Sequence, residues 1–308
     1  MTLAHAATAC EVIAPGWSES WLAGQLSPNT TRAYTADIRQ FVAFIGHRDL
    51  AAVRRTDLLR YLQLLTGKVD VGDYSPKTVN RKLSAVRQLF AEAVRHELID
   101  RSPADGIRGY KSEGNFSPTK APAVEQVIAL LDSLDTDALQ DVRDRAILYV
   151  MFGMGLRREE VADLRASDLS EHEGQAVLDA LGKGSKRRRQ AVPHTVLAAV
   201  RRWQAMTGIV DYDALFQPFP LNGECRPTGS SLTPNGLYDI VMRRFRAAGW
   251  TDCSPHSARH FFITYVIKHG ASIFQAQQMA GHADPRTTER YIRSSDDLAN
   301  SAAKFIDF

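Results

Sequence analysis

The sequence is poor in cysteine. Its three cysteines, Cys10, Cys225 and Cys253, lie far apart in a chain of 308 residues, with no C-x-x-C pair and no paired-histidine spacing. This distribution argues against a disulfide framework and against a structural zinc site. We therefore expect the chemistry of this protein to use no metal and no other cofactor.

Long apolar runs are also missing. No stretch of about 18 apolar residues occurs, and the first residues, MTLAHAATACEVIAPG, lack the basic start and apolar core of a secretory signal. The hydrophobic fraction of 44% and the charged fraction of 24% are typical of a soluble globular protein. These features predict a cytoplasmic protein with no membrane partner.

Neither sign of charge is in large excess, since the formal net charge is only +3. Arginine nevertheless predominates among the 38 basic residues, since 29 are arginine and 9 are lysine. The planar arginine fork suits bidentate contacts with phosphate, which favours a nucleic-acid partner. A high-GC coding bias would produce the same excess, so both explanations stay open at this point.

The N-terminal third has the periodicity of a helical bundle. Apolar residues recur at helical spacing over residues 27–46, 55–66 and 75–98. In the last of these segments the apolar stripe runs beside Lys77, Arg81, Lys82 and Arg87. The pattern predicts a small all-helical domain with one basic side.

Helical signals lapse over residues 108–123, which are rich in glycine, proline, serine and lysine. We place the domain boundary there, with an N-terminal helical domain over 1–110, a linker over 111–122 and a C-terminal domain over 123–308. The length of 308 residues is sufficient for two cores.

The C-terminal part is predicted to be mainly helical with a small β element. Helical spacing covers residues 124–134, 141–155, 156–164, 234–249, 256–269 and 271–280. Residues 175–193, QAVLDALGKGSKRRRQAVP, contain two strand-like runs around a Gly, Ser and Lys turn, which predicts a β-hairpin with a basic tip.

The segment GHADPRTTERY, residues 281–291, places His282 nine positions before Tyr291. A continuous helix would point these side chains to roughly opposite faces. Gly281 suits the end of one helix, and Asp284 with Pro285 suits the start of the next. A turn between the two helices would bring the histidine and the tyrosine toward a shared site.

Further polar residues are candidates for that site. His256 and Arg259 lie three apart on one predicted helix, Arg157 follows a glycine-rich break, and Lys183 lies between two glycines of the hairpin turn. Each has an ordinary interpretation: an ion pair of Arg157 with Glu160 or Glu159, a surface pair of His256 and Arg259, a half-buried Tyr291. The ordinary interpretation of the basic run is a solvated turn that contains Lys183, Lys186, Arg187, Arg188 and Arg189. With 9 histidines and 29 arginines, about one H-x-x-R match is expected by chance.

As an ordered set, these segments resemble the tyrosine recombinase family, also called the phage integrase family, in its Xer-like two-domain form. The matching motifs are G-L-R-x-x-E-[LV] at 155–161, G-K-G-x-K at 182–186, P-H-x-x-R-H at 255–260 and G-H-x-x-x-x-T-T-x-x-Y at 281–291. The resemblance covers most of residues 25–295. It implies a mainly α fold, in which a SAM-like helical core-binding domain precedes an α+β integrase-type catalytic domain with a small hairpin or sheet.

The resemblance also implies the residue roles. Tyr291 would be the nucleophile, Arg157 and Arg259 the phosphate clamps and Lys183 the general acid, while His256 and His282 would complete the site. The chain departs from the family at Met154, Arg158, Ala258 and Ala280, which are neighbours of these positions. DNA contacts are expected in the N-terminal domain from Thr31, Arg32, Lys77, Asn80, Arg81, Lys82 and Arg87. In the C-terminal domain they are expected from Lys186, Arg187, Arg243 and Arg244.

The function that the resemblance implies is site-specific DNA recombination through a 3′-phosphotyrosine intermediate, without metal or ATP. The partner would be double-stranded DNA with paired inverted sites, bound by a homotetramer on two duplexes or together with a related recombinase. The tail over residues 292–308 would dock on a neighbouring protomer or on its own domain. Two alternatives stay open: a type IB topoisomerase-like enzyme, and a non-catalytic architectural protein that only grips phosphate.

Overall fold

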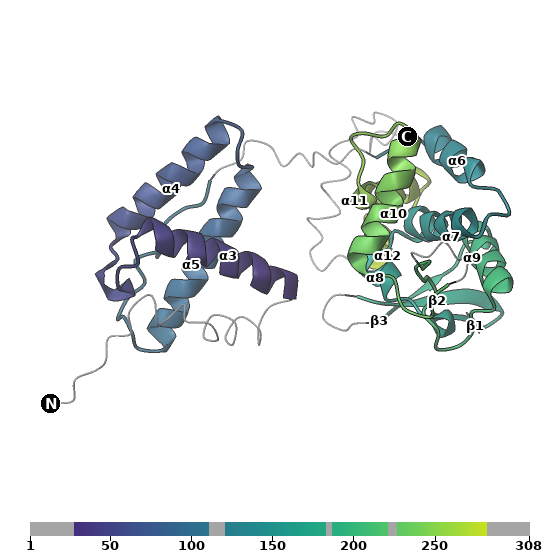
Figure 1. The fold of residues 1–308 in the computed structure, drawn as a ribbon, viewed down its shortest axis with the longest axis horizontal. Coiled ribbons are helices and arrows are strands. Elements are labelled where there is room, and N and C mark those ends of the chain that lie inside the picture. Colours follow the sequence, from purple (N-terminus) through teal and green to yellow (C-terminus); the bar gives the residue numbers. More distant parts are fainter. Residues whose placement is uncertain (1–27, 111–120, 183–186, 221–226, 282–308) are drawn as a thin grey trace, which may run out of the picture. The chain divides into compact units, whose positions relative to one another are not determined.

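The chain forms two compact units that divide between residues 114 and 115 (Figure 1). The computed structural model describes residues 28–110, 121–182, 187–220 and 227–281. No helix in these ranges is both long and apolar enough to cross a membrane. Each unit is described separately below.

Three helices make up most of residues 28–110, the described part of the N-terminal unit. They are α3 (Pro28–Phe44), α4 (Arg55–Asp70) and α5 (Pro76–Arg95), with a 3-10 turn at Leu50–Ala52. Both α3 and α4 pack on α5, whose buried positions follow the predicted apolar stripe. The Ser75 hydroxyl caps α5 by accepting the Thr78 amide at 3.1 Å. The three predicted helices are confirmed, with ends that shift by a few residues.

Aromatic rings fill the core of this unit. The Phe41 ring meets Tyr61 edge-on at 5.1 Å between centroids, and it meets Phe90 in the same way at 5.8 Å. Edge-to-face contacts of this kind add to the stabilisation from burial alone. One side chain from each of the three helices therefore locks the bundle together.

The C-terminal unit contains seven helices and three strands among its described residues. Its elements are α6 (Val124–Ser133), α7 (Leu139–Met154), α8 (Arg158–Ala162), β1 (Leu169–His172), β2 (Gln175–Leu181), β3 (Arg187–Ala191), α9 (His194–Thr207), α10 (Pro234–Ala247), α11 (Pro255–Lys268) and α12 (Ile273–Ala280). A 3-10 turn, Ala166–Asp168, precedes β1. The central helix is α7, which packs on α6, α9, α10 and α11 and is buried along most of its length.

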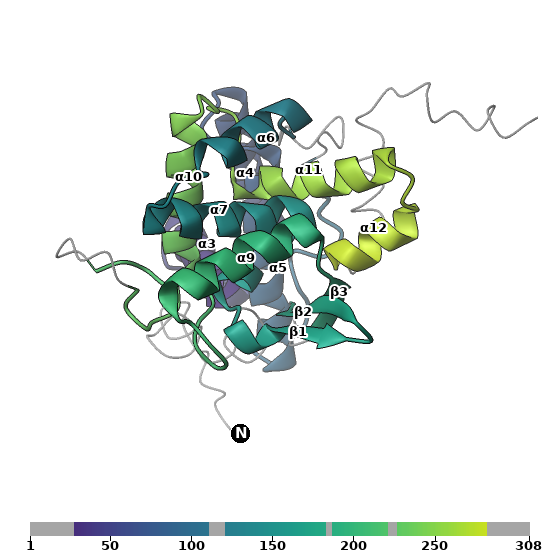
Figure 2. The same ribbon diagram turned by 90° about the vertical axis from the view of Figure 1, so that its right-hand side faces the viewer.

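The sheet is antiparallel with the order β1-β2-β3, and it lies beside α9 and α12 in Figure 2. Leu181 pairs with Arg187, so the predicted hairpin is confirmed. Side chains alternate between the faces of a strand, and in β3 this turns Arg188 and Gln190 inward while Arg187 and Arg189 are exposed. Neither β1 nor α9 was assigned from the sequence.

One expectation for the N-terminal unit is wrong. The sequence placed Lys82 on an exposed basic side, whereas the structure buries it at 8% exposure. Its ammonium donates to Asp37 Oδ1 at 2.8 Å and to Gln40 Oε1 at 2.6 Å. Lys82 is therefore part of the bundle interior, where a charge is tolerated because a carboxylate and an amide oxygen hold it.

Candidate active site

A glycine break positions the first candidate, Arg157. Helix α7 ends at Gly155, which has a left-handed φ of 64°, and a Cβ there would collide with the ring of Phe262. Two residues later Arg157 is the N-cap of α8. The chain thus turns sharply between two helices, and the sequence prediction that Arg157 opens a helix is confirmed.

The Arg157 side chain is held by a buried carboxylate. Its Nη1 donates to Glu160 Oε1 at 2.8 Å, its backbone amide donates to Glu160 Oε2 at 2.8 Å, and its Nη2 donates to the Gly281 carbonyl at 3.0 Å. Glu160 is only 4% exposed, whereas the Arg157 side chain keeps 32% of its surface. The ion pair that the ordinary interpretation anticipated is present, and the guanidinium still reaches the surface.

The second candidate pair lies at the start of α11. Arg259 is 1% exposed, and its guanidinium donates to the Gly155 carbonyl at 2.8 Å and to the Ala280 carbonyl. His256, three residues earlier on the same helical face, is exposed. The interpretation of these two residues as a surface pair is wrong for Arg259, because that side chain is buried.

The candidates converge on one small pocket of about 210 Å³. Its lining residues are Leu156, Arg157, Arg158, Glu159, Pro255, His256 and Arg259. Burial alone would raise the pKa of Glu159, but hydrogen bonds, chiefly from Arg158, and the nearby arginines lower it overall. The pocket therefore presents an imidazole and three guanidinium groups against one ionised carboxylate, a combination suited to an anion.

A second histidine of the motif, His260, does not line this pocket. It is 7% exposed, and its Nδ1 lies 3.3 Å from Thr264 Oγ1. Burial lowers the pKa of its imidazole, which favours the neutral form. Among the described residues, His256 is thus the histidine that the fold presents beside the two candidate arginines.

The carboxyl end of α12 contacts the arginines of this region. Gly281 ends the helix with φ 62°, as the sequence predicted. The last carbonyls accept from charged or polar side chains: Met279 from Gln190, Ala280 from Arg259 and Arg188, and Gly281 from Arg157. Unpaired carbonyls at a helix end attract cations, which explains why arginines gather here.

Four of the predicted catalytic and DNA-contacting positions lie outside the described residues. They are Lys183, Lys186, His282 and Tyr291. Lys183 and Lys186 fall between β2 and β3, and His282 and Tyr291 follow the end of α12. Both flanking elements contact the groups described above. Arg188 of β3 donates to Glu160, and the last carbonyls of α12 accept from Arg157 and Arg259.

The DNA-contact candidates differ in exposure and in the contacts they make. Arg32, Lys77 and Arg187 are exposed.

Other candidates make hydrogen bonds within the N-terminal unit. The Asn80 amide exchanges hydrogen bonds with the Tyr110 backbone, at 3.0 and 2.8 Å, and Arg87 donates to the Ile107 carbonyl. Arg81 pairs with Asp37 beside the buried Lys82, and the Thr31 carbonyl accepts from Thr35.

On α10, the remaining two candidates meet a buried carboxylate. Arg243 and Arg244 donate to Asp144 Oδ2 at 2.9 and 2.7 Å, and Arg143 pairs with the other oxygen of the same carboxylate. Asp144 is fully buried, while the Arg243 side chain is 55% exposed. These arginines fasten α10 to α7, and Arg243 retains an outward surface.

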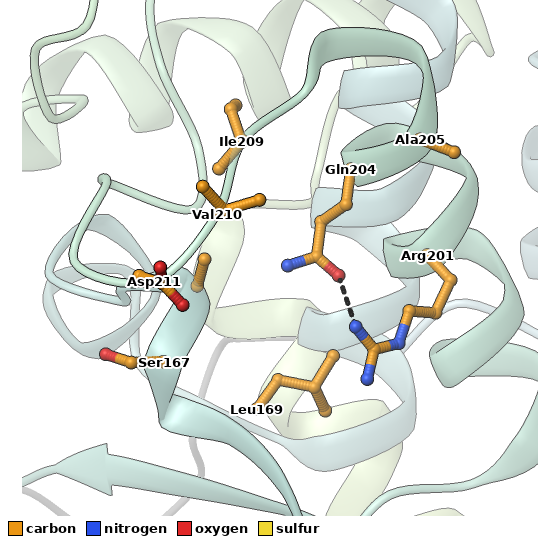
Figure 3. A pocket seen from close by; sticks show the side chains of 9 residues that line it. Ser167, Leu169, Arg201, Gln204, Ala205, Ile209, Val210 and Asp211 are labelled. Atoms are coloured by element: carbon orange, nitrogen blue, oxygen red, sulfur yellow. Dashed lines mark hydrogen bonds between the residues drawn. The ribbon is translucent and has the colours of Figure 1, made fainter.

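Two larger pockets among the described residues lack this chemistry. A pocket of about 440 Å³ between α9 and the 3-10 turn is lined mainly by apolar residues, and Arg201 there points to Gln204 at 3.2 Å (Figure 3). A pocket of about 740 Å³ in the N-terminal unit contains Arg87, whose guanidinium is engaged by a carbonyl. Neither lining includes a histidine, so volume alone does not indicate the reactive site.

Comparison with known proteins identifies the family of the chain. The model named "Phage integrase family" matches residues 123–297, and "Phage integrase, N-terminal SAM-like domain" matches residues 17–97. The chain belongs to the phage integrase family. The SAM-like helical domain and the integrase-type catalytic fold expected from the sequence are thereby confirmed, as is the class of enzyme, a DNA strand-transferring recombinase.

Individual relatives cover most of the chain. "Tyrosine recombinase XerC" of Herpetosiphon aurantiacus is 30% identical over 281 residues, which span 89% of this chain and 87% of the relative. "Tyrosine recombinase XerC" of Alcanivorax borkumensis is 30% identical over 273 residues, with 87% and 84% covered. These relatives match both units.

Solved structures share the fold at low identity. The XerH site-specific recombinase bound to palindromic difH substrate, in a post-cleavage complex, has a TM-score of 0.70 at 21% identity and covers 92% of this chain and 81% of its own. A lambda integrase (75–356) dimer bound to a COC′ core site has a TM-score of 0.69 at 14% identity, covering 92% and 94%.

Sequence reasoning missed Arg188. It assigned this residue to a solvated turn, whereas the structure places it in β3 with its side chain 13% exposed. Its Nη2 donates to Glu160 Oε2 at 3.2 Å. The alternation of a strand through RRRQ was the available signal, because it separates the inward positions 188 and 190 from their neighbours.

Proposed function

We propose that the protein is a site-specific recombinase that cleaves and rejoins DNA strands through a covalent 3′-phosphotyrosine. The observation that carries the proposal is the pocket in which Arg157, His256 and Arg259 come together from two different helix starts. These three motif residues span 102 positions of the sequence. Their side chains line one pocket whose charges suit an anion.

In this proposal the arginines stabilise the scissile phosphate. Negative charge grows on the non-bridging oxygens during attack, and preorganised guanidinium groups stabilise it more than they stabilise the ground state. Arg259 is fixed by two carbonyls and Arg157 by Glu160 and a carbonyl. Fixed donors need little reorganisation during the reaction, which is the property that such catalysis requires.

Proton transfers complete the chemistry. The Tyr291 oxygen attacks phosphorus as its proton passes to a base, for which His256 or His282 is proposed. The bond from phosphorus to the 5′ oxygen breaks, and Lys183 donates a proton to that departing oxygen. The phosphodiester energy is retained in the tyrosyl link, so that a second strand's 5′ hydroxyl can reverse the reaction without ATP.

The proposed partner is duplex DNA with paired inverted sites, bound by four protomers on two duplexes or by this chain with a related recombinase. We propose the domain limits 1–110, 111–122 and 123–308, with the tail over residues 292–308 docking between protomers. Relatives support the DNA partner, since one is solved on a palindromic substrate and another as a dimer on a core site. Integration, excision and dimer resolution are all compatible with this chemistry.

Tyr291→Phe tests the proposal, because it removes the hydroxyl and keeps the ring. A suicide substrate, whose cleaved fragment diffuses away, should give a protein-DNA adduct on a denaturing gel for the wild type only. Gel-shift affinity for uncut DNA should stay within about threefold, since one polar contact contributes little beside many phosphate contacts. An adduct that persists in the variant contradicts the assignment.

The alternatives predict other outcomes of the same experiment. No adduct in the wild type, with normal DNA affinity, would favour the architectural interpretation. Adduct formation with relaxation of supercoils, but without strand exchange between two sites, would favour a topoisomerase-like enzyme.

A further inference from the structure

Arg188 on β3 is placed between the two candidate phosphate clamps. It shares the Glu160 carboxylate with Arg157, through Nη2 at 3.2 Å, and it shares the Ala280 carbonyl with Arg259, through Nη1 at 3.4 Å. Through these two contacts, Arg188 hydrogen-bonds an acceptor of each clamp. Arg188 itself does not line the pocket.

Charge balance gives this placement a consequence. Glu160 is 4% exposed and its negative charge is directed at Arg157 at 2.8 Å. With Arg157 as its sole cationic partner, the carboxylate would cancel much of the positive potential of that guanidinium toward a substrate. Arg188 supplies a second cation on the far oxygen of the same carboxylate. Together with Glu160, the guanidinium groups of Arg157, Arg188 and Arg259 then keep a net positive charge around the pocket.

The backbone is shaped to accept Arg188. Gly281 has a left-handed φ of 62°, and a Cβ at this position would overlap Nη1 of Arg188. The arginine therefore packs directly against the residue that ends α12 and precedes His282. Because Arg188 also lies in the strand that follows the hairpin tip with Lys183, one side chain joins three segments that carry proposed catalytic residues.

We infer that Arg188 is a positioning residue for strand cleavage, which neutralises Glu160 so that the positive charge of Arg157 acts on the scissile phosphate, and which fixes the end of α12 against β3. The inference rests on the proposed function. It concerns rate rather than affinity, because Arg188 is 13% exposed and lies behind the pocket wall.

The test compares Arg188→Met with Arg189→Met. Arg189 is the matched control: it is the next residue of the same strand, and it pairs with Asp179 on the exposed face at 2.7 Å. Single-turnover cleavage of a suicide substrate is measured at saturating DNA, with gel-shift affinity and thermal melting alongside. We expect Arg188→Met to slow cleavage about ten- to hundredfold with affinity within about threefold, and Arg189→Met to stay near the wild type.

A second substrate separates electrostatics from mere structure. A methylphosphonate at the scissile position lacks the charged non-bridging oxygen, so that the missing positive potential matters less. On this substrate the ratio of wild-type to Arg188→Met rates should shrink at least tenfold, and Arg188→Lys, which restores the charge, should recover part of the rate on ordinary DNA. If Arg188→Met melts early, Arg188→Gln takes its place with the same expectations.

Two results overturn the inference. One is a wild-type cleavage rate in the Arg188 variants, and the other is an equal loss on both substrates without recovery by lysine. Failure of the proposed function gives a different result, since the wild type itself would then form no adduct.

Discussion

Each unit of the molecule contains a buried carboxylate that binds two basic side chains. In the N-terminal unit Asp37, 2% exposed, accepts from Arg81 and Lys82; in the C-terminal unit Glu160, 4% exposed, accepts from Arg157 and Arg188. The local electrostatics are alike. Burial of such a group is tolerated in both because the charge is paired and hydrogen-bonded.

What differs is the surroundings of the two carboxylates. Lys82 lies 5.2 Å from the centroid of the Tyr74 ring and hydrogen-bonds Gln40, so its charge serves contacts between α3 and α5. Arg157 instead borders a pocket that also contains His256 and Arg259. The comparison teaches that a buried ion pair alone does not identify a reactive site. The candidate site differs from the Asp37 network in having an arginine with an exposed side and further basic side chains around a pocket.

The largest expected effect concerns the clamps themselves. Arg157→Ala and Arg259→Ala should each lower single-turnover cleavage about 10²- to 10³-fold, because such donors act mainly in the transition state. Affinity should fall less than tenfold. Cleavage gels and gel-shift titrations on the same protein preparations measure both. If both variants lose affinity and rate in equal proportion, the pocket is a binding site and not a catalytic one.

A second prediction sets the two carboxylates against each other. Asp37→Asn should lower the free energy of unfolding by about 1–3 kcal/mol, since it leaves the buried Lys82 without a counter-charge. Its cleavage rate at saturating DNA, measured below the melting range, should match the wild type. Glu160→Gln removes a negative charge, but its amide has only one acceptor oxygen and cannot hold both the guanidinium and the backbone amide of Arg157. The loss of this positioning should slow cleavage at least tenfold in addition to any change in melting.

Circular-dichroism melting and single-turnover cleavage of both variants provide the comparison. A cleavage defect in Asp37→Asn that exceeds the one in Glu160→Gln would show that the two networks do not divide into folding and chemistry.

The smallest expected effect concerns the basic residues of the N-terminal unit. Arg32 and Lys77 are exposed, whereas Lys82 is buried. Replacing Arg32 and Lys77 together with alanine should weaken DNA binding and reduce the slope of log affinity against log salt by about two. Lys82→Met, tested at a temperature where it is folded, should leave that slope unchanged. Titrations at several salt concentrations measure these slopes. An altered slope for Lys82→Met would show that Lys82 contacts DNA.

Much of the fold was predictable because helical periodicity is a strong local signal. Helix α5 illustrates this, with buried Val79, Leu83, Val86 and Leu89 at helical spacing. Helix α9 has the same signal in Val196, Ala199, Val200 and Trp203, which are all buried, but the sequence reading did not use it. Strand β1 has four residues with one buried side chain, too few for an alternating pattern.

The candidate site was predictable only as an ordered set of motifs. Arg157, His256 and Arg259 are distant in sequence, and no local period brings them together. The partner of each charged side chain was harder to predict, because that partner comes from another helix or strand. Asp37 is 45 residues from Lys82, and Ala280 is 92 residues from Arg188. Whether an arginine faces DNA or a carbonyl is therefore a tertiary property.

The most direct measurement is the position of the covalent link between protein and DNA. The trapped adduct is digested with nuclease and trypsin and analysed by mass spectrometry. Trypsin cleaves after Arg290 and Arg293, so the account predicts a nucleotide phosphate on the tyrosine of residues 291–293. A phosphate found instead on Tyr238, whose ring centroid lies 5.7 Å from the Arg158 guanidinium carbon, or on the exposed Tyr265, would contradict the proposed nucleophile.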